Sequence, residues 1–297
     1  MALSSVDLTP SGTVEAVVPP GTGRRNRIRG NFEVWVPAAV LVVVLGACFV
    51  APFLGVLTPP NATNLNAARL TVGSPGHLLG TDALGRDLLS RALYGGRLSF
   101  LIGVASVGMG LLIGGCLGIV AGFRGGWLDG LIMRLLDVFL AFPSLVLALA
   151  VAAYLGPSAR NVIFAISFFS VPFYARVARA TTLKLREKDF VLASQLSGVD
   201  PRGAALRHVV PNVMPDLLSY GILLIGVAMI LEASLSYLGL GVRPPQATWG
   251  TMIADAQNEL SDAPYMALVP GAFLFVTVIS LNLLGDAVRS GRGKRRP

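Results

Sequence analysis

Six long apolar stretches constrain the fold of this chain more than any other feature of its sequence. They lie at about 34–57, 98–122, 131–155, 162–180, 217–238 and 265–287. A helix needs about 20 predominantly apolar residues to cross the hydrocarbon core of a bilayer. The composition agrees, because only 13% of the 297 residues are charged, about half the share found in soluble domains. The sequence therefore predicts an all-α integral membrane protein with six transmembrane helices.

The basic residues predict how these helices are oriented. If the N-terminus is cytoplasmic, 18 of the 24 Lys and Arg residues fall in cytoplasmic segments. Cytoplasmic loops carry the excess of Lys and Arg in membrane proteins, so both termini are expected on the cytoplasmic side of the membrane. Residues 1–33 are interpreted as a disordered basic leader, 34–288 as the transmembrane domain, and 289–297 as a basic tail that faces anionic lipid rather than nucleic acid. Arg176 and Arg179, at the end of the fourth stretch, are interpreted as snorkelling to the interface.

Small residues and prolines predict how the spans pack and bend. The second stretch carries a glycine at every fourth position: Gly110, Gly114, Gly118 and Gly122. This spacing predicts a glycine ridge on one helix face, where another helix approaches closely. Pro143 and Pro172 are expected to kink the third and fourth spans, with neighbouring helices satisfying the freed carbonyls.

The stretch at 77–100 is expected on the outer side. Its leucines fall on one helical face, and its charged and hydroxyl side chains fall elsewhere: Arg86, Asp87, Ser90 and Arg91. This pattern predicts an amphipathic helix at about 82–95 that lies on the outer membrane surface. His77 has no second ligand nearby, so neither a metal site nor a cofactor is expected.

Glu232 lies within the fifth apolar stretch, with Ser234 close to it. A carboxylate in hydrocarbon is costly, so Glu232 must face protein or a water-filled cavity. Two interpretations stay open. Glu232 is either a hydrogen-bonded structural acid between helices, or, together with Ser234, a residue that lines or gates a translocation pathway.

The cytoplasmic loop at about 184–215 is too long and too helix-like for a simple connection. A first short amphipathic helix is expected over 188–197, and Gly198 ends it. Asp200 followed by Pro201 is typical of a new helix start, and the second helix is expected to stop before Pro211. Two short helices at an angle, exposed outside the membrane, predict a docking surface for a partner.

Motifs for catalysis are missing from the sequence. It contains no G-x-x-x-x-G-K-[ST] phosphate-binding loop, and its two histidines fall on opposite sides of the membrane. The chain is therefore expected to bind no nucleotide and to catalyse no reaction by itself.

Four linked motifs resemble those of a known family. They are "HLLGTDALGRDLLSRALYGGRLS", "YARVARATTLKLREKDFVLAS", "RHVVPN" and "EASLSYLGLGVRPP". Over about 34–289 the chain resembles the permeases of binding-protein-dependent ABC importers, C-type, in the dipeptide/oligopeptide/nickel group. Leu192, Ala193 and Ser194 take the place of the family's EAA motif, followed by Gly198 and Pro211 at the family spacing. Ser194 replaces the usual alanine, no tryptophan precedes "YAR", and the C-terminus lacks the usual Asp-Pro-Arg ending.

The resemblance implies a fold, a set of partners and a function. The family has six transmembrane helices and a cytoplasmic coupling helix that sits in a cleft of an ATPase subunit. The expected partners are a homologous second permease, two ABC ATPases and an external solute-binding protein. The residues implied in coupling are Phe190, Leu192, Ala193, Ser194, Gly198, Asp200, Arg202, Leu206, Arg207, His208 and Pro211.

The expected function is ATP-driven import of dipeptides or oligopeptides, with nickel or another small solute as the alternative within the group. A secondary transporter is less consistent with the sequence, because that class usually needs several ionisable groups inside its spans. Glu232 is the only acid that the sequence places in the middle part of a span. A membrane anchor without transport activity is the remaining alternative.

Overall fold

The computed structural model describes residues 22–55, 57–189, 191 and 200–293, with side chains from residue 34 to 290 except at 201 and 202. Within these ranges the chain is helical, apart from loops and two isolated β-bridges, Ser74 with His77 and Thr81 with Asp87. The expected all-α fold is confirmed.

Five described helices contain stretches long and apolar enough to cross a membrane, and one bent pair makes a sixth span. In chain order the spans are α1 (Thr22–Val50), α2 (Leu88–Arg124), the pair α3 (Gly126–Leu140) with α4 (Ser144–Leu155), α5 (Ala159–Arg186), α8 (Val210–Tyr237) and α10 (Tyr265–Gly293). The shorter elements are η1 (Ala51–Phe53), η2 (Leu65–Ala67), α7 (Pro201–Ala204), η3 (Ala205–Val209), α9 (Trp249–Asp255) and η4 (Gln257–Glu259). The first helix begins at Thr22, twelve residues before the expected start of the span at residue 34. Arg is a good helix former, so the basic residues that precede the apolar segment extend α1 toward the N-terminus.

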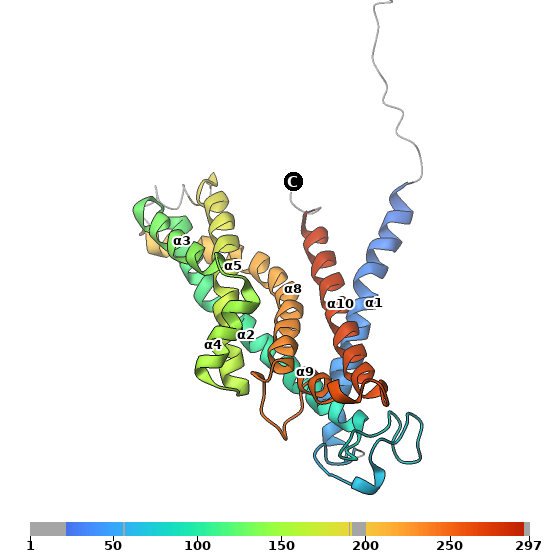
Figure 1. The fold of residues 1–297 in the computed structure, drawn as a ribbon. Helices are drawn as coiled ribbons and strands as arrows, with labels where there is room; N and C mark the ends of the chain where they lie inside the picture. Colours follow the sequence, from blue (N-terminus) through green and yellow to red (C-terminus); the bar gives the residue numbers. More distant parts are fainter. Residues whose placement is uncertain (1–21, 56, 190, 192–199, 294–297) are drawn as a thin grey trace, which may run out of the picture.

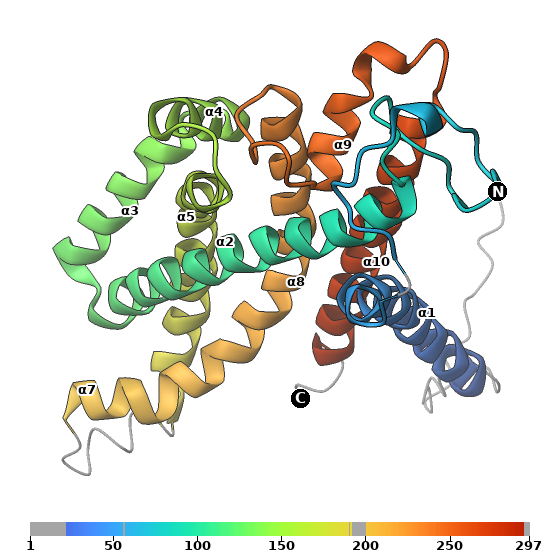
Figure 2. The ribbon, with the colours of Figure 1, turned by 90° about the horizontal axis from the view of Figure 1, so that it is seen from below.

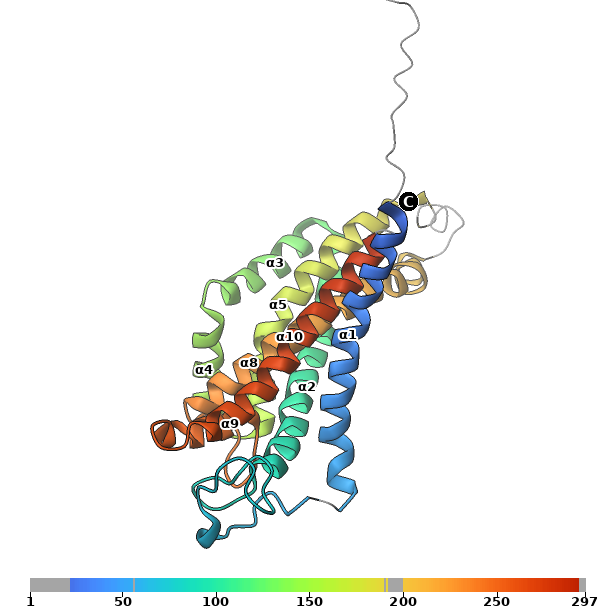
Figure 3. The ribbon, with the colours of Figure 1, turned by 90° about the vertical axis from the view of Figure 1, so that its right-hand side faces the viewer.

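The spans alternate in direction, so both ends of the described chain lie at the same end of the molecule. Figures 1 and 3 show the start of α1 and the end of α10 at the top, with the loop 57–87 and α9 at the bottom. The segment around α7 also lies toward the upper end. The two ends of the bundle therefore differ: one carries the termini and the predicted docking loop, and the other carries long irregular loops.

Two apolar clusters hold the bundle together. One lies between α2, α4, α5 and α8 and includes Ile102, Ile166 and Leu217. The other lies between α1, α2, α8 and α10 and includes Leu41 and Met229. Figure 2 shows α2 and α8 between the α3–α4–α5 group and the α1–α10 pair. Because α2 and α8 belong to both clusters, they form the frame of the fold.

The glycine ridge on α2 packs against α5, as its spacing predicts. A Cβ atom at Gly114 would lie 2.2 Å from the carbonyl oxygen of Val171, and one at Gly118 would lie 2.2 Å from that of Ala175. Real Cβ atoms never approach an oxygen so closely, so α2 and α5 make a contact that only glycine allows.

The third span is broken rather than kinked. Helices α3 and α4 meet at 85° across residues 141–143, and Pro143 precedes the first residue of α4. Proline cannot donate the backbone hydrogen bond that would continue α3. Pro172, in contrast, lies inside α5, which continues through it from Ala159 to Arg186.

The separate surface helix expected at about 82–95 is not present. Residues 82–87 form a turn, and α2 begins at Leu88 and continues directly into the second span. The side chains also face differently from expectation, because Arg86, Asp87, Ser90 and Arg91 are buried and Leu84 is exposed. The physical reason is that the preceding loop folds back over the start of α2 and supplies partners for these polar groups, including Asp82.

Candidate functional site

The N-terminal half of the predicted docking loop lies largely outside the described residues. Phe190, Leu192, Ala193, Ser194 and Gly198 belong to that part of the loop, and the same holds for the side chain of Arg202. The described neighbour Val191 is fully buried and belongs to the apolar cluster that also contains Val209 and Val213. The loop is therefore anchored to the bundle on both sides of that segment.

The C-terminal half of the loop is a helical extension of α8, and not a separate helix that stops before Pro211. Helix α7 passes into the π-helical turn η3, in which Val210 N donates to Ala205 O, and α8 begins at Val210. Pro211 sits in the first turn of α8. A proline is accommodated there because the preceding π-helical turn already departs from the regular α-helical hydrogen-bond pattern, to which proline cannot donate.

This extension presents one large apolar side chain to solvent. Leu206 is 69% exposed, and Asp200, Arg207 and Pro211 are also exposed. His208 is partly buried, and its carbonyl accepts a hydrogen bond from the Asn212 side chain at 2.7 Å. An exposed leucine beside charged groups, at the end of the bundle, is suited to contact another protein.

Glu232 is fully buried and hydrogen-bonded at both carboxylate oxygens. Ser99 on α2 donates to Oε2 at 3.1 Å, and Ser236 on α8 donates to Oε1 at 2.8 Å. The Ser99 hydroxyl also accepts from the backbone N–H of Trp249, at 3.1 Å. The carboxylate therefore joins α2, α8 and α9. This geometry favours the interpretation of Glu232 as a structural acid, because satisfied buried polar groups fix the packing of helices.

Ser234 does not join this network. Its hydroxyl donates to the carbonyl of Ile230 in its own helix, at 2.9 Å. The two residues that the sequence grouped as a pathway or gate therefore have different surroundings, and only Glu232 connects separate elements.

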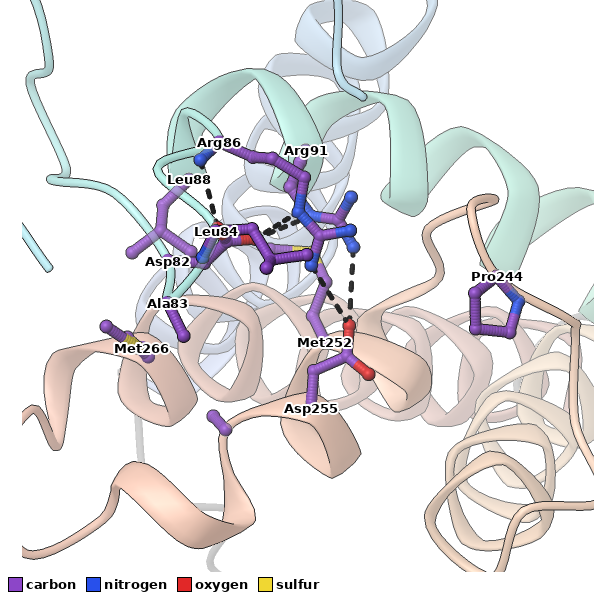
Figure 4. Close-up of a pocket in the computed structure, with 11 residues that line it drawn as sticks. Asp82, Ala83, Leu84, Arg86, Leu88, Arg91, Pro244, Met252, Asp255 and Met266 are labelled. Carbon is purple, nitrogen blue, oxygen red and sulfur yellow. Dashed lines mark hydrogen bonds and ion pairs between the residues drawn. The ribbon is translucent and has the colours of Figure 1, made fainter. Parts of the chain in front are cut away.

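The opposite end of the bundle holds a charged pocket of about 280 Å³ (Figure 4). Buried Arg86 and Arg91 each place Nη2 3.5 Å from Oδ2 of the half-exposed Asp255, and both contact Asp82. Two acids thus oppose two bases, and the network ties the loop before α2 to α9. Sequence reasoning missed it because Asp255 is distant in the chain.

Two further contacts hold the same loop. Arg69 donates to Glu259 at 2.8 Å, and this hydrogen bond raises the pKa of the Arg69 guanidinium above its ordinary value. His77 Nδ1 lies 2.9 Å from Asp87 Oδ1, and Asp87 caps α2 by accepting from Ser90 N at 2.8 Å. His77 therefore has a structural partner, and the described residues contain no group of three side chains suited to hold a metal ion.

Charged pairs also connect α3 to α5, where the sequence suggested snorkelling arginines. Arg176 Nη2 lies 2.6 Å from Asp137 Oδ1, and Arg179 Nη2 lies 2.6 Å from Asp129 Oδ2. The acids are on α3 and the arginines on α5. Both arginines are therefore paired within the protein instead of extending alone to the interface.

Comparison with known proteins agrees with these features. A family model described as "Binding-protein-dependent transport system inner membrane component" matches residues 114–292. The chain is 40% identical over 259 residues to the "Glutathione transport system permease protein GsiD" of Pectobacterium atrosepticum, covering 86% of this chain and 85% of the relative. It is 42% identical over 233 residues to the "Di/tripeptide transport system permease protein DppC" of Pseudomonas aeruginosa, covering 78% and 75%. It is 37% identical over 275 residues to the "Probable D,D-dipeptide transport system permease protein DdpC" of Escherichia coli K12, covering 90% and 92%.

Proposed function

Because the chain belongs to the family of binding-protein-dependent transport system inner membrane components, we propose that it is the permease subunit of an ATP-driven importer for small peptides. It forms half of the translocation pathway, and a homologous second permease forms the other half. ATP is hydrolysed on two partner subunits, so this chain is non-catalytic and needs no cofactor. An external solute-binding protein delivers the substrate.

Peptides are the substrate class best supported. The relatives are named for glutathione, di/tripeptides and D,D-dipeptides. Nickel is not favoured, because a metal path would be expected to contain clustered histidine, cysteine or carboxylate ligands, and the described part of the chain contains no such group.

The exposed extension of α8 is the observation that carries the proposal. It lies toward the same end of the bundle as the start of α1 and the end of α10 (Figures 1 and 3), and the excess of Lys and Arg in the segments at that end supports a cytoplasmic location. Leu206 projects there, 69% exposed, from a helix that continues into the membrane. A movement of a docked ATPase would therefore be transmitted directly to α8.

Affinity purification from native membranes tests this proposal. The tagged chain should recover two ATPase subunits and a second permease. After reconstitution with the binding protein, the complex should import a labelled dipeptide only when ATP is supplied on the cytoplasmic side. Import driven by an ion gradient without ATP would identify a secondary transporter instead. Recovery of the chain without ATPases, and without import, would identify an anchor.

A further inference from the structure

The Asp137–Arg176 ion pair is exposed in a segment that spans the membrane. The two side chains are 55% and 54% exposed although their charged atoms lie 2.6 Å apart. Arg176 lies within the fourth apolar stretch, four residues before its end at residue 180, and Asp137 lies within the third, six residues after its start at residue 131. Facing lipid at this depth would be costly for both charges. The surface that carries the pair is therefore covered by water or by protein.

The break in the third span leads to the same conclusion from independent evidence. Residues 141–143 between α3 and α4 are exposed, and a bend of 85° interrupts the helical hydrogen bonds there. Ala141 N still donates to Asp137 O and Phe142 N to Phe139 O, but the regular series of helical hydrogen bonds stops at Pro143, which has no N–H to donate. Non-helical backbone at membrane depth is tolerated only where it is buried in protein or lines a water-filled cavity.

An aromatic cavity of about 280 Å³ adjoins both features. Two prolines, Pro143 and Pro172, contribute to its wall together with five phenylalanines: Phe139, Phe142, Phe168, Phe169 and Phe173. Leu140 and Phe173 also line the cavity, and they lie three residues from Asp137 and from Arg176 respectively, so cavity and ion pair belong to one surface of α3 and α5. That surface offers an acid, a base and an apolar hollow large enough for a side chain.

We propose that this surface lines the translocation pathway and contacts the peptide during import. A zwitterionic peptide presents an ammonium group, a carboxylate and apolar side chains, which match Asp137, Arg176 and the aromatic cavity respectively. The proposal rests on the proposed function, since it assigns a contact surface within that importer. A contact with the second permease is the competing explanation for the same exposed charges.

Accessibility to water separates these explanations. The test uses the variant Phe142→Cys, at the helix break, in a chain from which Cys48 and Cys116 have been removed. The thiol of Phe142→Cys should react with a membrane-impermeant, positively charged methanethiosulfonate. Addition of ATP and vanadate should change the rate of this labelling by at least about fivefold. The control is Leu135→Cys on α3, which is similarly exposed but lies outside the cavity lining and should stay unreactive. An unreactive Phe142→Cys that crosslinks to the second permease would overturn the proposal.

Transport by charge-neutral variants supplies the second test. The double variant Asp137→Asn, Arg176→Gln should assemble normally, but dipeptide import per assembled complex should fall at least about tenfold. The matched control, Asp129→Asn with Arg179→Gln, removes the less exposed pair on the same two helices and should leave import per complex within about twofold. Wild-type import by the Asp137/Arg176 variant contradicts this inference alone, whereas absence of ATP-driven import by the wild-type complex contradicts the proposed function.

Discussion

Ser99 on α2 donates a hydrogen bond to Glu232 on α8 across 3.1 Å, and the same hydroxyl accepts one from Trp249 at the start of α9. One serine thus links a buried carboxylate to the start of α9, at the end of the bundle that carries the long loops (Figure 1). The link explains how an acid is tolerated in an apolar span, because the carboxylate is satisfied by hydroxyl donors within the protein.

The first prediction concerns this carboxylate. Glu232→Gln keeps one acceptor oxygen for one serine, and its amide N–H can donate to the hydroxyl of the other, so most assembly and import should be retained. Glu232→Leu should lower stability by about 1–3 kcal/mol, because it leaves Ser99 and Ser236 without their acceptor. Complex yield and the thermal unfolding midpoint in detergent measure both effects. A Gln variant that assembles fully but does not import would establish Glu232 as a gate.

The second prediction concerns the glycine ridge. Gly118→Ala should destabilise the chain by about 1–3 kcal/mol, because its Cβ would collide with the carbonyl of Ala175. Gly108→Ala is the matched control, since a Cβ there meets nothing within 4 Å. It should be neutral or should stabilise α2 by up to about 1 kcal/mol, because alanine is the better helix former. Equal thermal stability of the two variants would contradict the close α2–α5 contact.

The third prediction concerns the charged pocket between the loop 57–87 and α9. Asp255→Asn leaves Arg86 and Arg91 opposed by Asp82 alone, so the loop 57–87 should be held less tightly. We expect a loss of about 1–2 kcal/mol, less than for a fully buried pair because Asp255 is half exposed. Limited proteolysis of this loop measures the effect. The same substitution at exposed Asp262 should not change the cleavage rate, and equal rates for both variants would contradict the role given to Asp255.

The fourth prediction concerns topology. In a chain without its native cysteines, Gln246→Cys should react in intact cells with an impermeant thiol reagent, whereas Leu206→Cys should react only after the membrane is opened. Both positions are exposed in this chain, and labelling of opened membranes from which the ATPase subunits have been stripped shows that Leu206→Cys is reactive once the reagent reaches it. Labelling of Leu206→Cys in intact cells would reverse the orientation.

The spans and their packing could be predicted from local sequence patterns. A run of apolar residues determines whether a helix crosses the membrane, and the four-residue glycine spacing marks the face that meets α5. The apolar run and the glycine spacing can each be read from one continuous segment of the sequence, without knowledge of its partners in the fold. The break at Pro143 was anticipated as a kink, since proline removes a hydrogen bond, but its angle of 85° depends on how α3 and α4 pack against α5.

The polar networks could not be predicted, because their partners are far apart in the chain. Arg86 and Asp255 are separated by 169 positions and Arg176 and Asp137 by 39, and no periodic pattern reports such pairings. The alternation of charged and apolar residues at 82–95 instead suggested a surface helix. The π-helical turn before Pro211 was missed for a related reason: a proline predicts a helix end more often than a helix that continues around it.

The most direct test of the account is whether the α8 extension couples the chain to an ATPase. Leu206→Asp, in a complex that still reaches the membrane, should abolish both dipeptide import and the stimulation of ATP hydrolysis by the loaded binding protein, while basal hydrolysis remains. Leu65→Asp is the control at the opposite end of the bundle, where Leu65 is 72% exposed against 69% for Leu206, and it should retain the stimulation. If Leu206→Asp imports dipeptide and stimulates ATP hydrolysis like the wild type, the extension is not the coupling element.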